Sequence, residues 1–295
     1  MSDFVLSCCS AADLSAEQME KRNISYISFH FELDGKQYMD DLGQSVPYHE
    51  FYQRMLAGEM TKTSQVNADE FVEYFGKFME EGKDVLHVTL SSGISGTLNS
   101  AKLAKHVLEE KYPDRKLYIV DSLAASGGYG LFVDKLADLR DEGKTIDEIY
   151  EFAEAHKLEL NSWFFSTDLT FFIRGGRVSK TAGFVGSMLN ICPILNIDYQ
   201  GKLIPREKIR TKKKVISRLV DIMLEHAKDG ADYKEKCLIT HSDCYDDARA
   251  VADIIEEKIP ALRGKVVINY IGNLIGAHTG PGTVALFFWG DKRTD

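Results

Sequence analysis

The stretch Asp84-Val-Leu-His-Val-Thr-Leu-Ser-Ser-Gly-Ile-Ser-Gly-Thr97 decides the fold of this 295-residue chain. Its first half is a short apolar run, which is typical of a buried strand in a parallel sheet. Beyond the Ser/Gly segment, apolar residues recur at helical spacing from Leu98 to Leu108. The stretch therefore predicts a strand, a tight turn and a helix.

The turn between this strand and this helix has the composition of an anion site. The first N–H groups of a helix have no acceptor within the helix, and Gly93 and Gly96 leave room for a ligand beside the backbone. Further donors are the hydroxyl groups of Ser91, Ser92, Ser95 and Thr97. With the positive end of the helix they predict a site for a carboxylate or a phosphate. The alternative is that the serines only cap the helix and the glycines only permit the turn.

Two more segments of the first half have the same order of strand, small-residue turn and helix. One begins at Phe4 to Ser7 and continues into the capping-box pair Ser15 and Gln18, and the other begins at Leu117 to Asp121. Three such units predict an α/β fold with a parallel sheet. Because the C-terminal ends of its strands share one edge, we expect a ligand there.

The segments between these units predict smaller elements. Alternation from Ile27 to Leu33 predicts one strand, and Asp34-Gly35 predicts a hairpin turn after it. Glu59 to Gln65 has the composition of a polar loop, and the spacing of Thr145 and Glu148 predicts another capping box.

The character of the sequence changes near residue 160. We expect residues 1–160 to form an N-terminal parallel-sheet α/β domain and residues 161–295 to form a C-terminal α+β domain. The second half predicts a helix containing Val185, Met188 and Leu189, a hairpin around Asp198 to Gly201, and a strand from Thr283 to Trp289. Since no flexible linker is visible, we expect the two domains to pack tightly, with a ligand at their junction.

Composition and charge exclude several classes of protein. With 36 Lys and Arg against 45 Asp and Glu, the net charge is −9, which argues against nucleic acid as the main partner. The five cysteines include no CxxC pair, and no signal peptide is visible, so we expect a cytoplasmic protein with reduced thiols. No apolar run approaches the roughly 20 residues of a membrane-spanning helix. His241 and Cys244 lack further ligands at zinc-site spacing, so we expect neither a metal nor a cofactor.

Four polar motifs stand out in the whole chain. They are Thr63-Ser-Gln65, Ser91-Ser-Gly-Ile-Ser-Gly-Thr97, Gly175-Gly-Arg177 with Ser179-Lys180, and Ala277-His-Thr-Gly-Pro-Gly282. In this order, and together with Asp13-Leu14, Asp121-Ser122 and Arg210-Thr211, they closely resemble the DegV family of bacterial fatty-acid-binding proteins. The resemblance covers essentially the whole chain.

The resemblance implies a non-catalytic carrier that buries one long-chain fatty acid in a tunnel. It implies a partner kinase that phosphorylates the fatty-acid carboxylate with ATP, after which the acyl phosphate enters phospholipid synthesis. Carried over by motif, Thr63 and Ser95 bind the carboxylate, His278 lies beside it and Arg177 lies at the mouth of the site. Further candidates for this site are Ser64, Ser92, Gly93, Gly96, Thr97 and Thr279.

Plainer interpretations of these residues remain open. Thr63 is also suited to capping a turn, Arg177 to a surface salt bridge, and His278 to a place in the core. The sequence does not decide whether His278 is neutral or protonated. Burial of a carboxylate requires several hydrogen bonds, which hydroxyl groups and helix-end amides supply without a full positive charge.

A serine acyl hydrolase is the alternative function. Ser95, Asp121 and His278 follow the Ser, Asp, His order of α/β-hydrolases, and Ser95 lies in a strand-to-helix turn. However, the elbow pattern G-x-S-x-G fails because Thr97 occupies the second glycine position. We therefore expect no hydrolysis.

Residues 206–214 form the strongest basic run of this acidic chain. Cations at the start of a helix oppose its dipole, so a helix beginning near residue 211 does not explain them. We expect Arg210, Lys212 and Lys213 to face an acidic partner or an anionic membrane surface during loading or release. The plainer alternative is a solvated face.

Overall fold

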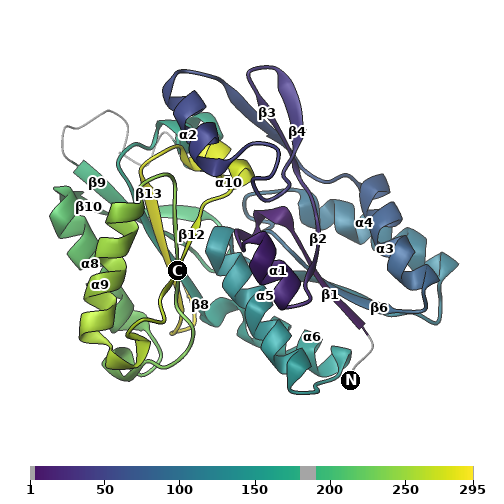
Figure 1. The fold of residues 1–295 in the computed structure, drawn as a ribbon. Helices are drawn as coiled ribbons and strands as arrows, with labels where there is room; N and C mark the ends of the chain where they lie inside the picture. Colours follow the sequence, from purple (N-terminus) through teal and green to yellow (C-terminus); the bar gives the residue numbers. More distant parts are fainter. Residues whose placement is uncertain (1–3, 180–190, 295) are drawn as a thin grey trace.

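The computed structural model of the protein describes residues 4–179 and 191–294. Figure 1 shows two main sheets side by side, flanked by helices, with a small third sheet above the point where they meet. Lys180 and the helix predicted around Val185, Met188 and Leu189 lie outside the described residues.

The first sheet is parallel throughout, as the sequence predicts. Its order is β2-β1-β6-β7, with β1 at Phe4–Cys9, β2 at Ser25–Ile27, β6 at Asp84–Thr89 and β7 at Leu117–Asp121. Val85 pairs with Val5 on one side and Leu117 on the other, and most of β6 is buried, which explains its nearly continuous apolar sequence.

Helices cover both faces of this sheet. On one face α3 (Ala68–Glu80) packs against α4 (Thr97–Lys111), and on the other α5 (Ser126–Asp141) packs against α6 (Ile146–His156). The short α1 (Ala16–Lys21) follows a 3₁₀ turn at Ser10–Ala12. Both predicted capping boxes, Ser15 with Gln18 and Thr145 with Glu148, are confirmed.

A small antiparallel sheet corrects two predictions. The expected strand from Ile27 to Leu33 divides, because the chain leaves the parallel sheet after β2 and begins β3 at His30–Leu33. The predicted hairpin leads into β4 (Lys36–Met39). The predicted polar loop is instead a strand, β5 (Thr61–Ser64), which pairs with β3 so that Thr63 lies opposite Phe31. Helix α2 (Tyr48–Leu56) packs its aromatic residues beneath this sheet.

The second sheet is mixed and has the order β10-β9-β8-β13-β11-β12. Its strands are β8 (Leu160–Ser166), β9 (Ile191–Ile197), β10 (Leu203–Arg210), β11 (Leu238–His241), β12 (Val267–Tyr270) and β13 (Thr283–Trp289). The predicted hairpin of β9 and β10 is confirmed. The helices of this half are α7 (Thr170–Arg174), α8 (Lys212–His226), α9 (Tyr245–Lys258) and α10 (Asn273–Thr279), with 3₁₀ turns at Lys157–Glu159, Gly230–Asp232 and Pro260–Leu262.

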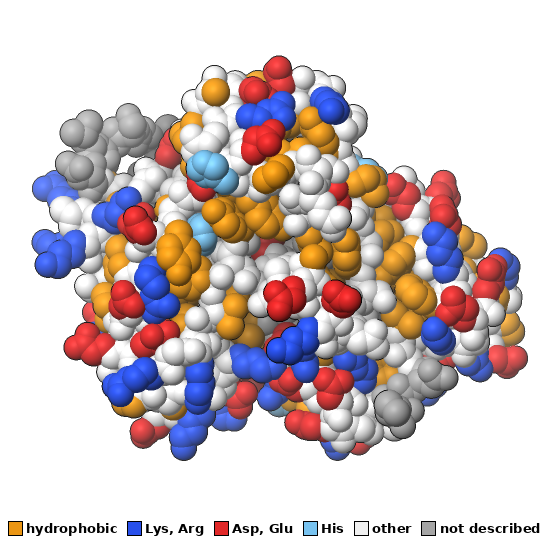
Figure 2. Space-filling view, viewed as in Figure 1, with side chains coloured by type: hydrophobic (Ala, Val, Ile, Leu, Met, Phe, Trp, Pro, Cys, Tyr) orange, Lys and Arg blue, Asp and Glu red, His pale blue; other side chains and the backbone are white. Residues whose placement is uncertain are grey.

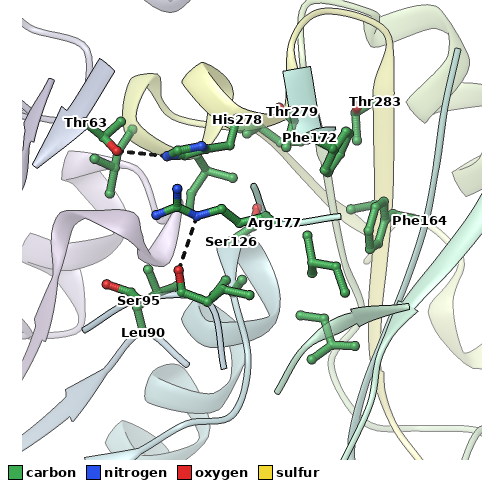
Figure 3. Close-up of a pocket in the computed structure, with 18 of the residues that line it drawn as sticks. Thr63, Leu90, Ser95, Ser126, Phe164, Phe172, Arg177, His278, Thr279 and Thr283 are labelled. Atoms are coloured by element: carbon green, nitrogen blue, oxygen red, sulfur yellow. Dashed lines mark hydrogen bonds between the residues drawn. The ribbon is translucent and has the colours of Figure 1, made fainter. Parts of the chain in front are cut away.

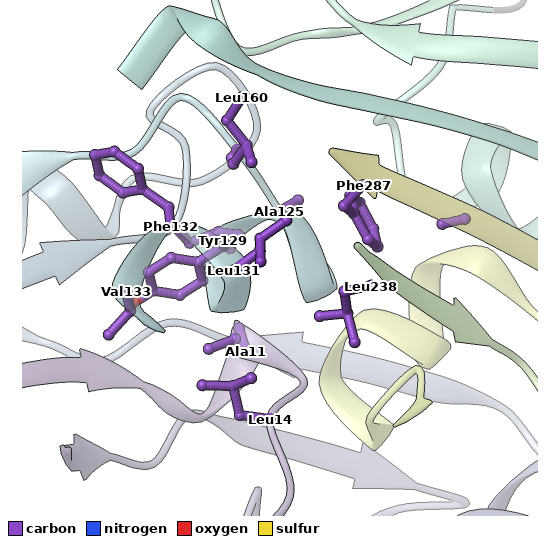
Figure 4. Close-up of a cluster of buried hydrophobic side chains, with 14 of the residues drawn as sticks. Ala11, Leu14, Ala125, Tyr129, Leu131, Phe132, Val133, Leu160, Leu238 and Phe287 are labelled. Carbon is purple, nitrogen blue, oxygen red and sulfur yellow. The ribbon is translucent and has the colours of Figure 1, made fainter. Parts of the chain in front are cut away.

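Helix α5 joins the two sheets. It contacts β1 of the first sheet and β8, β11 and β13 of the second, and Tyr129, Phe132 and Phe287 belong to one continuous core around it (Figure 4). The close packing of α5 against the second sheet depends on glycine. A Cβ on Gly127 would lie 2.6 Å from the Thr240 methyl group, and a Cβ on Gly128 would lie 2.7 Å from the Phe287 ring. Among the described residues, no helix has the length and the apolar character needed to cross a membrane.

Candidate functional site

A cavity of about 400 Å³ lies where the C-terminal edge of the first sheet faces the second sheet. Its volume is in the range of small-molecule sites. Leu90 and Ser126 line it from the first sheet and α5, Thr63 lines it from β5, and His278 lines it from α10. Figure 2 shows hydrophobic side chains gathered in the hollow below α2 and α10.

Most of the cavity wall is apolar. The lining hydrophobic residues are Phe29, Leu90, Ile94, Ala125, Phe164, Phe172, Ile197, Leu203, Ile271, Leu274, Ile275, Ala285 and Phe287. Four polar side chains, Thr63, Ser95, Arg177 and His278, lie together on one side in Figure 3, whereas Phe164 and Phe172 lie on the other. The cavity is therefore amphipathic, with a polar end and a mostly apolar remainder that also includes Ser126, Ser162 and Thr283.

His278 is held at the polar end by a hydrogen bond with Thr63. Its Nε2 atom lies 2.8 Å from the Thr63 hydroxyl oxygen, across 215 residues of sequence, and its buried Nδ1 atom has no hydrogen-bond partner in the described structure. Burial, together with the charge of Arg177, lowers the pKa of His278 to about 4. The imidazole is therefore neutral at pH 7, and the side chain acts as a hydrogen-bonding group rather than as a fixed charge.

Arg177 supplies positive charge to this end of the cavity. Its guanidinium donates from Nη1 to the Gly175 carbonyl at 2.6 Å and from Nε to the Ile94 carbonyl at 3.3 Å. Burial lowers its pKa from the usual value. Within residues 4–179 and 191–294, no acidic side chain forms an ion pair with Arg177, so the predicted alternative of a surface salt bridge is wrong for that part of the chain.

The Ser/Gly turn contributes less to the cavity than the sequence predicts. Ser95 lines the cavity, and its hydroxyl oxygen accepts a hydrogen bond from the Thr97 amide at 3.3 Å. Ser92 is exposed, and Thr97 is buried away from the cavity lining. The Ser91 hydroxyl donates to the Gly201 carbonyl at 2.8 Å, so this hydroxyl joins the turn to the β9–β10 hairpin.

The two glycines of this turn accommodate the protein rather than a ligand. A Cβ on Gly93 would lie 2.5 Å from the Gly201 carbonyl oxygen, and a Cβ on Gly96 would lie 2.7 Å from the Gln65 side-chain oxygen. Both glycines therefore have a packing role, because neighbouring segments occupy the space that a side chain would take.

The glycines after His278 have a similar explanation. Gly280 has a φ of +65°, and a Cβ there would lie 2.1 Å from the Phe171 ring. Thr279 lines the cavity while its hydroxyl donates to the Gly280 carbonyl at 3.3 Å, and Ser64 lines the cavity beside Thr63. The fold therefore brings Thr63, Ser64, Ser95, Arg177, His278 and Thr279 to the cavity and leaves Ser92, Gly93, Gly96 and Thr97 outside its lining.

The three residues of the alternative hydrolase do not form a relay. One carboxylate oxygen of Asp121 accepts hydrogen bonds from the Ser92 and Leu123 amides, both at 3.1 Å. His278 instead pairs with Thr63. In the described part of the chain, no hydrogen bond joins His278 to Asp121 or to Ser95, so the imidazole lacks the orienting carboxylate that a triad requires.

The basic run divides into paired and exposed residues. Helix α8 begins at Lys212, as predicted, and the ammonium group of Lys212 lies 2.8 Å from the Asp247 carboxylate on α9. Lys212 therefore forms a surface ion pair between two helices, and its side chain stays 50% exposed. Arg210 and Lys213 are also exposed.

Several functional candidates escaped prediction from the sequence. Gln65 and Ser126 line the cavity, as do side chains from β8 and β13. The Thr63-Ser-Gln65 motif contains a signal for Gln65, and Ser126 lies in the small-residue turn after Leu117 to Asp121, at the strand edge where a ligand is expected, although it was not singled out as a site residue. No cluster of three or more His, Cys, Asp or Glu residues suited to a metal occurs in the described segments, and His241 Nδ1 accepts the Cys244 amide.

Comparison with known proteins gives consistent matches over the whole length. The DegV family model matches residues 9–291. A DegV domain-containing protein of Clostridium perfringens is 38% identical, over 99% of each chain. A protein of Thermotoga maritima named fatty acid-binding protein is 32% identical, over 93% of each chain.

Solved structures share the fold. The crystal structure of a DegV lipid binding protein from Thermotoga maritima is 30% identical, has a TM-score of 0.80, and is matched over 100% of both chains. The Streptococcus pneumoniae fatty acid kinase (Fak) B3 protein loaded with linoleic acid has a TM-score of 0.82 at 23% identity, with 99% of this chain and 100% of that chain covered. At this identity the second likeness shows the fold alone.

Proposed function

The chain belongs to the DegV family, and from that premise we propose that it binds one long-chain fatty acid in this cavity and presents the carboxylate to a partner kinase. In this proposal Thr63, Ser95 and His278 bind the carboxylate, with Arg177 beside them. The acyl chain occupies the apolar remainder of the cavity. The protein itself catalyses no reaction.

The single observation that carries the proposal is the polar end of an otherwise apolar cavity. A carboxylate is costly to bury unless its oxygens receive hydrogen bonds. The Ser95 hydroxyl and the hydrogen-bonded pair of Thr63 and neutral His278 each supply a donor, and the half-buried guanidinium of Arg177 gains from a carboxylate partner. Because each buried CH₂ group contributes about 0.8 kcal/mol, a chain of about sixteen carbons supplies ample affinity.

The partner and the pathway follow from the family. We place the protein in the cytoplasm, where a separate kinase subunit would transfer the γ-phosphoryl group of ATP to the bound carboxylate. The resulting acyl phosphate would enter phospholipid synthesis. The Streptococcus pneumoniae protein, which is named for a fatty acid kinase and holds linoleic acid, supports this arrangement by its fold.

The exposed pair Arg210 and Lys213 supports transient contact with an anionic membrane surface during loading. Each basic side chain near such a surface contributes about 1 kcal/mol. Replacing both residues with Gln should reduce association with vesicles of anionic lipids. Lys212→Gln is the matched control, because Lys212 is already paired with Asp247. Unchanged vesicle association of the double variant would contradict this part of the proposal.

The first experiment is mass spectrometry of an organic extract of the purified protein. We expect about one fatty acid per wild-type chain and much less in a Thr63→Ala, Ser95→Ala double variant, because the carboxylate loses two donors. Ser92→Ala is the matched control, since Ser92 lies outside the cavity lining. A wild-type protein that carries no fatty acid and takes up none when it is added would refute the proposal.

The kinase step needs its own experiment. Incubation of the loaded protein with ATP and the kinase subunit should give an acyl phosphate, which hydroxylamine traps as the hydroxamate. Labelling of Ser95 by a fluorophosphonate, or release of free fatty acid from an ester, would instead favour the hydrolase.

A further inference from the structure

Two buried carboxylates at the junction of the sheets have no part in the proposed binding reaction. Asp13 follows β1 and its 3₁₀ turn, adopts a φ of +50°, and is 5% exposed. One of its carboxylate oxygens accepts a hydrogen bond from the Gly272 amide at 3.0 Å. The other accepts the hydroxyl of Ser126, a residue of the cavity wall.

Asp40 is a second buried acidic residue near this junction. It follows β4 and is 2% exposed. The Ser10 side chain and the Leu274 backbone lower its pKa, while burial raises it. Gly272 is the N-cap residue of α10, and Leu274 lies in its first turn. Asp13 therefore satisfies an amide at the start of this helix that has no acceptor within it.

Helix α10 connects these hydrogen bonds at its start with His278 at the polar end of the cavity. His278 is six residues beyond Gly272, which is about 9 Å along a helix at 1.5 Å per residue. Further hydrogen bonds hold the start of the helix, namely Tyr52 hydroxyl to the Ile271 carbonyl at 2.8 Å and Asn273 amide to the Val46 carbonyl at 2.8 Å. A helix fixed so firmly at one end has little freedom at the other.

We propose that Asp13 is a positioning residue, which fixes α10 so that the His278 imidazole lies against Thr63 at the carboxylate end of the cavity. Through Ser126, Asp13 also fixes a second point of the cavity wall. This inference rests on the proposed binding of a fatty acid, and it assigns a role to the Asp13-Leu14 motif.

The energetic cost of these carboxylates supports such a role. Burial raises the pKa of Asp13 to about 8, so its neutral acid predominates at pH 7, and it raises the pKa of Asp40 to about 6. Even a neutral polar group costs free energy to bury, and hydrogen bonds offset this cost only in part. Groups with strongly perturbed pKa values cluster at functional sites.

The test is a double-mutant cycle on fatty-acid binding. We expect Asp13→Ala to weaken binding about tenfold in the wild-type background, and less than about twofold in a His278→Ala background. Asp41→Ala is the matched control, because the Asp41 carboxylate bonds to the Gln44 and Ser45 amides of its own loop. Equal losses in both backgrounds would overturn the proposal.

A second measurement needs no ligand. The imidazole ¹⁵N signals of His278, assigned by comparison with His278→Ala, should shift in Asp13→Ala and not in Asp41→Ala. Asp13→Asn keeps an oxygen for the Gly272 amide and should restore most of the wild-type signal. Asp13→Leu, which removes both oxygens and leaves less empty space, replaces the alanine variant if that variant does not fold. Unchanged imidazole signals would overturn the inference, whereas absence of fatty-acid binding by the wild type would refute only the proposed function.

Discussion

Gly175 offers a sharp test of the polar end, because it lies directly behind His278. A Cβ at this position would lie 2.4 Å from the Nδ1 atom of His278. The backbone of Gly175, with φ −71° and ψ −9°, is one that alanine adopts freely. Gly175→Ala therefore acts on the imidazole by contact alone.

The size of the effect follows from the geometry. An ordinary contact requires the ring to retreat by about 1 Å. Since Nε2 is already 2.8 Å from Thr63, the ring cannot yield toward that side and must rotate, which breaks the hydrogen bond. We expect a loss of about 1–3 kcal/mol in the free energy of unfolding, and about tenfold weaker fatty-acid binding.

Denaturant unfolding and titration with a fluorescent fatty acid measure the two effects. Gly176→Ala is the matched control. Gly176 has a φ of +73°, so the change strains the backbone, but a Cβ there meets no atom within 4 Å. We expect this control to lose stability and to keep its affinity. If Gly175→Ala binds as tightly as the wild type, the assignment of His278 to the carboxylate site fails.

Three further changes test the site. Arg177→Gln should weaken binding of an ionised fatty acid about tenfold or more, because the carboxylate loses a charged partner. Binding of the matching fatty alcohol should stay nearly unchanged. Equal losses for both ligands in calorimetric titrations would contradict the role of the charge. Gly93→Ala should lower the free energy of unfolding by about 1–3 kcal/mol, because the added Cβ clashes with Gly201, and should not change the fatty-acid content of the folded protein. Loss of the bound fatty acid, measured by mass spectrometry, would instead indicate that Gly93 contacts the ligand. The pKa of His278 is about 4 in the folded protein, against 6.5 for the ordinary group, so the unfolded chain binds a proton at a higher pH than the folded one. The free energy of unfolding therefore has its full value above pH 6.5. It decreases by up to about 3 kcal/mol as the pH falls toward 4. Urea unfolding of His278→Gln should show a smaller loss over this range, and identical pH profiles of variant and wild type would count against a buried neutral imidazole.

The parallel sheet was predictable because its signals are local. The apolar run of β6, the Ser/Gly turn and the helical spacing after Thr97 lie within one short stretch, and two capping boxes mark the starts of other helices. Strand β5 was not predictable from such signals. It is short and half exposed, and its Thr-Lys-Thr-Ser sequence gains a partner only when β3 leaves the first sheet.

Site residues that lie in a recognisable sequence motif were predictable. Residues whose role depends on packing against distant parts of the chain were not. Thr63, Arg177 and His278 lie in motifs that a family resemblance identifies. The packing role of Gly93 was not predicted because its neighbour, the β9–β10 hairpin, is more than one hundred residues away in sequence. The contact of Asp13 with Ser126 was not predicted for the same reason, since neither residue has a local pattern that indicates the other.

The order of strands in the second sheet has a consequence for biosynthesis. Strand β13, at the end of the chain, lies in the middle of the sheet between β8 and β11. The ribosome makes the N-terminal segments first, so β8 to β12 are made before β13. Until β13 is added between β8 and β11, the second sheet cannot close around the cavity. A nascent chain that ends before Thr283 therefore leaves the apolar faces of β8 and β11 uncovered. Such chains are the ones that chaperones and proteases should recognise.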